Sequence, residues 1–101
     1  MIITFKDHHQ WLGSRQGGKN AKKTLRAVIE NASAECPVVF DFAGVHSISS
    51  SFADEFFGKL IAEMGFDQFK AVTTFKNVSP FVISIIKNSI FHRNENVFVK
   101  S

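Results

Sequence analysis

The chain has 101 residues, of which 45% are hydrophobic and 21% charged, a balance typical of a folded globular domain that excludes intrinsic disorder. This length allows one hydrophobic core and is too short for two, so we expect a single domain over residues 1–101. The net charge is +3, and residues 1–26 hold six basic side chains against one carboxylate, so an anionic partner would be steered to that segment.

The apolar pattern predicts strands that alternate with helices. A short strand is expected at 2–5, a turn-rich loop at 11–18, and a helix at 19–31 whose apolar residues recur at helical spacing. The nearly continuous apolar run 36–42 predicts a central strand that is covered on both faces of the sheet.

A second helix is expected at 52–64, with Ser51 as its N-cap, Asp54 in a capping-box position and Gly65 at its end. The later elements are a strand at 69–75, a helix at 80–88 that begins at Pro80, and a strand at 97–99. The inward side chains of the last helix are expected to be Phe81, Val82, Ile85 and Ile86. This alternation predicts an α/β fold with a small, at least partly parallel sheet.

Three consecutive serines precede the second helix. Ser49, Ser50 and Ser51 would lie beside the unpaired N–H groups and partial positive charge of a helix N-terminus, where a phosphate is well accommodated. Three interpretations remain open: helix capping alone, a surface for partner contact, and a phosphorylation switch that adds about −1.5 to −2 charges. The carboxylates of Asp54 and Glu55 in the first turn would repel such a phosphate.

The block 38–60 resembles the core motif of STAS domains, the fold of sulphate transporters and anti-sigma-factor antagonists. It is closer to a STAS-like family of unknown function, and the similarity extends over about residues 13–86. The residues that carry it are Asp41-Phe42-x-Gly44-Val45, Ser50-Ser51-Phe52-Ala53-Asp54 and, more weakly, Gly13-Ser14-Arg15. The resemblance implies a small STAS-like sandwich, with about four strands in a mixed, partly parallel sheet covered by three helices.

The resemblance also implies an intracellular regulatory module that binds a protein partner and is not an enzyme. In anti-sigma-factor antagonists a partner kinase phosphorylates a serine of the matching loop; by position that serine is Ser50, with Ser51 and Ser49 as further candidates. The implied partner is a sensor-kinase-type ATPase or another regulator, and the phenylalanine-rich composition makes a homo-oligomer a second candidate. The candidate partner-binding residues are Asp41, Gly44, His46, Ser50, Ser51, Asp54 and Glu55.

An alternative function uses the glycine-rich segment 13–20, which fits the phosphate-binding pattern G-x-x-x-x-G-K. In this interpretation the chain is a small anion- or nucleotide-binding protein. Asn20 replaces the hydroxyl that would ligate magnesium, so we do not expect nucleotide hydrolysis. The candidate anion-binding residues are Gly13, Arg15, Gly18 and Lys19.

Little further chemistry is expected. The four histidines have no spacing typical of metal ligands and the single cysteine has no second thiol, so we predict no metal site and no cofactor. Cys36 is expected to be buried or half-buried and inert. The basic side chains are not interleaved with aromatic ones, so nucleic-acid binding is not expected. No signal-peptide pattern or membrane-spanning run is visible, and we expect a cytoplasmic protein without membrane contact.

Overall fold

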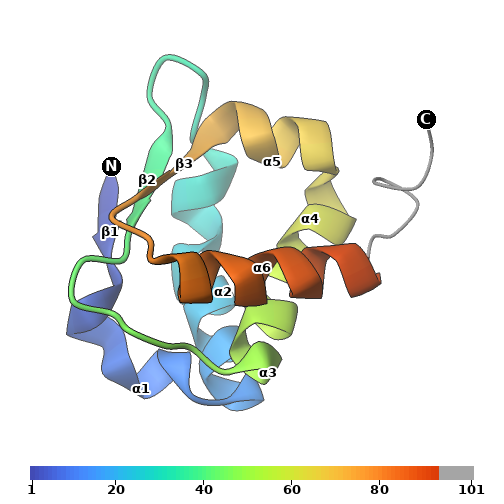
Figure 1. Ribbon diagram of the computed structural model, residues 1–101. Helices are drawn as coiled ribbons and strands as arrows, with labels where there is room; N and C mark the ends of the chain where they lie inside the picture. Colours follow the sequence, from blue (N-terminus) through green and yellow to red (C-terminus); the bar gives the residue numbers. More distant parts are fainter. Residues whose placement is uncertain (94–101) are drawn as a thin grey trace.

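A parallel sheet of three strands packs against a layer of helices in the computed structural model, which describes the backbone of residues 1–93 and the side chains of residues 1–91 (Figure 1). The chain forms a 3₁₀ turn at Phe5–His8 and a π-helical turn at Asp54–Gly58. The other elements are β1 (Ile2–Thr4), α1 (His9–Leu12), α2 (Arg15–Glu30), β2 (Val38–Asp41), α3 (Ser50–Ala53), α4 (Lys59–Met64), α5 (Phe66–Val72), β3 (Thr73–Lys76) and α6 (Pro80–Arg93).

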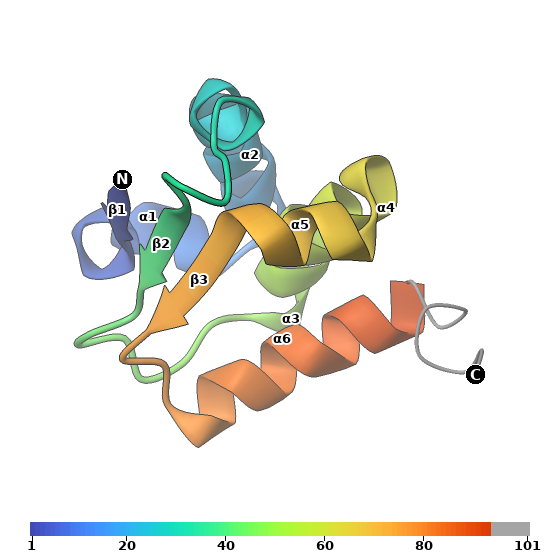
Figure 2. The same ribbon diagram turned by 90° about the horizontal axis from the view of Figure 1, so that it is seen from above.

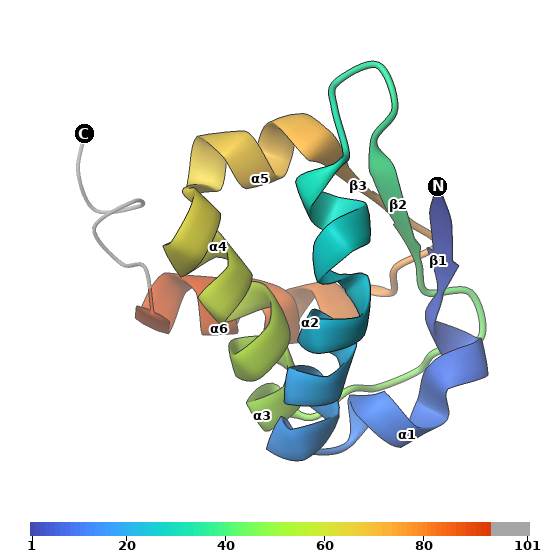
Figure 3. The same cartoon turned by 180° about the vertical axis from the view of Figure 1, so that it is seen from behind.

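The strand order is β1-β2-β3, so β2 is central as predicted, and it pairs in parallel with both neighbours. Because consecutive parallel strands lie side by side, crossovers of one hand place their helices on the same face of the sheet. Figure 2 shows α2 and the segment α3–α5 on that face, and Figure 3 shows α2 beside α3 and α4. The last helix, α6, packs along α3, the π-helical turn and α4.

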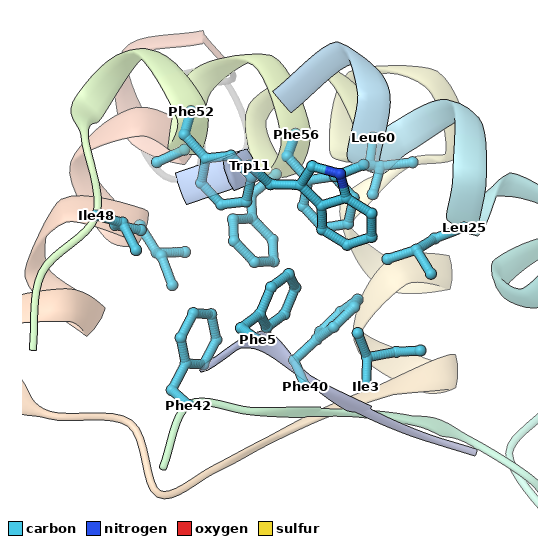
Figure 4. Close-up of a cluster of buried hydrophobic side chains, with 14 of the residues drawn as sticks. Ile3, Phe5, Trp11, Leu25, Phe40, Phe42, Ile48, Phe52, Phe56 and Leu60 are labelled. Carbon is cyan, nitrogen blue, oxygen red and sulfur yellow. The ribbon is translucent and has the colours of Figure 1, made fainter. Parts of the chain in front are cut away.

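Phenylalanine rings fill the space between the sheet and the helices. Phe5 and Phe40 are completely buried, and rings from the helices point toward them (Figure 4). The ring centroids of Phe5 and Phe42 are 4.8 Å apart, and those of Phe56 and Phe57 are 4.7 Å apart in an edge-to-face arrangement. Such ring pairs add to the stabilisation that comes from burial of apolar area.

The opposite face of the sheet lacks a covering helix within residues 1–93. Ile2 is 57% exposed, Thr74 and Lys76 are exposed, and Val39 and Asp41 of the central strand are half-buried. The prediction that both faces of this strand are covered is therefore wrong for the described part of the chain. The expected four strands, mixed sheet and sandwich are likewise not confirmed, since residues 1–93 form three strands that are all parallel. The strand expected at 97–99 lies outside the described residues.

The helix boundaries differ from the predicted ones at the glycines and serines. α2 begins at Arg15 instead of residue 19, because Ser14 caps it by accepting a hydrogen bond from the Gly17 N–H at 3.0 Å. The next helix begins at Ser50, because the N-cap is Ser49, whose Oγ accepts from the Phe52 N–H at 3.0 Å. The predicted Ser51 cap and its capping box are therefore wrong.

The carboxy-terminal half contains one more helix than predicted. α4 ends at Gly65 as expected (φ 89°), but residues 66–72 then form α5, and only 73–76 form a strand where 69–75 was expected. α6 begins at Pro80 as predicted and extends to residue 93 instead of 88. Phe81 is 59% exposed, contrary to prediction. The expected burial of Cys36 is also wrong, because this cysteine is exposed.

Candidate functional site

The serine cluster lies where the loop after β2 enters α3, and its three hydroxyl groups have different surroundings. Ser49 is half-buried and serves the helix, because its hydroxyl caps Phe52 and its backbone N–H donates to the Leu12 carbonyl at 2.9 Å. Ser50 is exposed and Ser51 is half-buried. One serine thus has the capping role, and the other two remain available for contact.

Ser50 and Ser51 border a cavity of about 390 Å³, here called the serine cavity. Residues from α2, α3 and α6 meet there, although they are far apart in the sequence. The lining residues are Arg15, Ser50, Ser51, Asp54, Ile85, Asn88 and Ser89. Asn88 and Ser89 were missed by the sequence analysis, because no local pattern indicates that α6 returns to the start of α3.

Arg15 connects two carboxylates at this cavity. Its Nη1 lies 3.0 Å from Asp54 Oδ2 and 3.0 Å from Glu55 Oε1, while its side chain stays 48% exposed. The hydrogen bonds to Asp54 and Glu55 raise the pKa of Arg15 further, so the guanidinium remains charged. The first turn of α2 is thereby tied to the helix that follows the serines.

Glu55 is an acidic side chain in the interior, with 3% of it exposed. Burial acts to raise the pKa of Glu55, but hydrogen bonds from Lys59 at 2.9 Å and from Arg15 outweigh it and lower that pKa below its ordinary value. The π-helical turn contains Glu55 and has an i to i−5 hydrogen bond from the Lys59 N–H to the Asp54 carbonyl. Single π turns in helices are frequent at functional sites.

The glycine-rich segment is largely part of α2 and has a packing role. A Cβ on Gly17 would lie 2.1 Å from the Trp11 carbonyl oxygen, and one on Gly18 would lie 2.8 Å from Glu55 Cβ. Both glycines therefore let helices approach closely. Lys19 is exposed, whereas Gly18 is buried. Anion binding at this segment stays a prediction, and the Arg15 guanidinium already has two carboxylate partners there.

Asp41 holds the turn at the carboxyl end of β2. Its Oδ1 accepts hydrogen bonds from the Ala43 N–H at 2.9 Å and from Asn77 Nδ2 at 3.1 Å, and these bonds lower the pKa of Asp41. Gly44 in the same loop has a φ of 79°, a conformation that favours glycine. His46 is exposed.

Five of the seven predicted partner-binding residues border two neighbouring sites, whereas Asp41 and Glu55 border neither. A second cavity of about 470 Å³ is bordered by Gly13, Gly44, His46 and Ser49, and the serine cavity is bordered by Ser50, Ser51 and Asp54. Glu55 lies beneath the surface. Ser49 and Ser50 are adjacent in the chain, so the two cavities neighbour each other at the start of α3.

Comparisons with other proteins identify the family of this chain. Among the described residues, no helix is long and apolar enough to cross a membrane, and no group of three metal-ligating side chains is present. No curated protein and no solved structure matches the chain. The model of the family described as "STAS-like domain of unknown function (DUF4325)" matches residues 20–82, which include β2, the serines and β3. The chain therefore belongs to this STAS-like family, as the motif around Asp41 and Ser50 suggested.

Proposed function

We propose that this chain is a regulatory module that binds a partner protein through the surface around Ser50 and Ser51, and that it acts by binding and not by catalysis. The observation that carries the proposal is the exposed Ser50 at the start of α3, on the rim of a cavity that α2 and α6 complete. Membership of the STAS-like family supports a module of this type.

The proposed docking surface is mixed, because Ile85 lines the serine cavity beside several polar side chains. Ser50 and Arg15 are exposed and Asp54 is half-buried, whereas the neighbouring apolar side chains of Ile48 and Phe52 are buried in the core. A partner would therefore meet hydroxyl, guanidinium and carboxylate groups at this site. Groups of this kind determine which partner binds and in what orientation.

Phosphorylation of Ser50 is the proposed switch, with a sensor-kinase-type ATPase as the proposed partner. The exposure of Ser50 gives a kinase access to its hydroxyl group. A phosphate would add about −1.5 to −2 charges beside Asp54. It would also compete with Asp54 and Glu55 for Arg15, which lines the same cavity. Binding of the partner would change because the charge of the surface changes.

The proposal is tested by a quantitative pull-down that compares the wild type with S50D and S84D. Both variants add one carboxylate at an exposed serine, and Ser84 on α6 is the matched control because it is not among the residues that line the serine cavity. We expect one partner to be retained by the wild type and by S84D and lost from S50D, and the purified pair to reproduce this order. F56D is unsuitable, because Phe56 is completely buried and its replacement would unfold the domain.

Two results would contradict the proposal. One is equal retention of all partners by S50D and S84D. The other is a rise of several degrees in melting temperature with ATP and magnesium that disappears in K19A, because this result would favour the ligand-binding alternative at residues 13–20.

A further inference from the structure

A third cavity is lined by residues of α6 on one wall and of α5 and β3 on the other. Figure 2 shows how α5 and β3 lie relative to α6. Its volume is about 590 Å³, within the range of roughly 300–1,000 Å³ that is typical of small-molecule sites. We call it the α5–α6 groove. Its main apolar residues are Phe69, Phe75, Ile83, Ile86 and Ile90.

The side of α6 that faces the groove is apolar. Val82 and Ile86 are buried and account for the packing of α6 on the core. Ile83 is only half-buried, and it lines the groove instead of the core. Ile86 and Ile90 also line the groove, so the apolar surface of α6 continues from its core-packing side onto the wall of the groove.

The charged residues that line the groove have the same sign. Lys70 extends from α5 and Lys87 from α6, so each wall contributes one exposed cation. No carboxylate is among the lining residues within the described part of the chain. The groove therefore combines an apolar floor with positive charge contributed by both of its walls.

We propose that the α5–α6 groove binds an amphipathic monoanion of the aliphatic carboxylate class. The hydrocarbon chain lies against Phe69, Phe75 and Ile83, and the carboxylate lies between Lys70 and Lys87. Small-molecule sites commonly combine apolar walls with a few polar groups that fix the orientation of the ligand. The two cavities share Asn88 at their borders, but the residues proposed to bind the ligand, Lys70 and Lys87, are not those proposed for docking at Ser50, so either proposal can fail without the other.

The test is an NMR titration of the ¹⁵N-labelled full chain with dodecanoate below its micelle-forming concentration. We expect saturable shift changes at Phe69, Phe75, Ile83 and Ile90. Decanoate should bind on the order of tenfold more weakly, because two methylene groups are missing. Dodecyltrimethylammonium has the same chain and the opposite charge, and it should not saturate the site.

Variants separate the charge from the fold. K87Q should weaken dodecanoate binding about threefold, in line with an exposed ion pair, whereas K23Q, the same change on the exposed part of α2, should leave it unchanged. I83S should weaken binding further without loss of the folded spectrum, because Ile83 is only half-buried.

Five results would overturn the proposal, and the first four are no saturable binding, equal binding of the cationic amphiphile, shift changes confined to residues outside the groove, and groove shifts that depend on protein concentration alone. The fourth result would assign the groove to a second copy of the chain. Tighter dodecanoate binding by F98S would also overturn it, because the natural occupant would then be the chain's own segment 94–101.

Discussion

Replacement of Gly17 by alanine tests whether the glycine-rich segment is shaped by packing. In a helix interior, glycine to alanine ordinarily stabilises by about 1 kcal/mol. Here the new Cβ would lie 2.1 Å from the Trp11 carbonyl oxygen and 2.6 Å from the Trp11 Cα, and these are main-chain atoms that no rotamer change can move away. α1 and α2 must separate by roughly 1 Å, and overpacking of this kind costs about 1–3 kcal/mol or more.

Because main-chain atoms must move, we take the upper end of this cost, about 3 kcal/mol, and after subtraction of the gain of about 1 kcal/mol in helix propensity we expect G17A to lose about 2 kcal/mol of unfolding free energy. For a domain of this size the melting temperature would fall by about 8–16 °C. Thermal and urea denaturation followed by circular dichroism measure both quantities. G13A is the matched control, because no atom lies within 4 Å of its added Cβ, and its stability should change by less than about 0.5 kcal/mol.

A melting temperature of G17A at or above that of the wild type would refute the packing argument. The glycine would then have to be explained by something that approaches the backbone from outside, such as the anion of the alternative function. Equal destabilisation by G13A and G17A would also refute it, because the contact with Trp11 would not be the cause.

Three further predictions concern Ser49, Glu55 and Cys36. In urea denaturation, S49A should destabilise the domain by about 1 kcal/mol, whereas S50A should change its stability by less than about 0.5 kcal/mol, because only Ser49 caps the helix. Equal effects of the two substitutions would contradict this division of roles. The pKa of Glu55 is lowered in the folded state, so the ionised Glu55 contributes fully to stability above the ordinary glutamate pKa of 4.5, and this contribution is lost as the pH falls through the folded-state pKa. The melting temperature of E55Q should therefore fall less steeply below pH 5 than that of the wild type. Cys36 should react with a maleimide in the native protein as fast as in urea, because it is exposed, and protection in the native state would contradict the structure.

The elements predicted correctly are those whose boundaries are marked by a few residues that are neighbours in the sequence. Pro80 with the preceding Ser79 marked the start of α6, and the Ser79 hydroxyl accepts from the Val82 N–H at 3.2 Å. Gly65 marked the end of α4, and the apolar run ending at Asp41 marked the central strand. The serine site was also found from local pattern, because strand, loop and helix start follow one another directly in the chain.

What the sequence did not predict depends on contacts between distant residues. Gly17 and Gly18 disfavour a helix locally, and only their packing against Trp11 and Glu55 explains why α2 contains them. Phe69 and Val72 in α5 are spaced for one helical face and both are buried, but their neighbours also fit a strand. The contribution of Asn88 to the serine cavity depends on the path of α6, which no short motif encodes.

The turn Asp54–Gly58 separates two stretches of helix that are out of phase with each other. A π turn holds one residue more than an α turn, and each residue of an α-helix rotates the direction of its side chain by ~100°. Deleting one residue from this stretch would therefore convert it to an ordinary α turn and leave Leu60 and Ile61 buried, whereas a deletion within α4 would rotate the side chains after it by ~100°. In related chains, the number of residues between the serines and the glycine that ends the helix thus indicates whether the π turn that contains the buried Glu55 is retained.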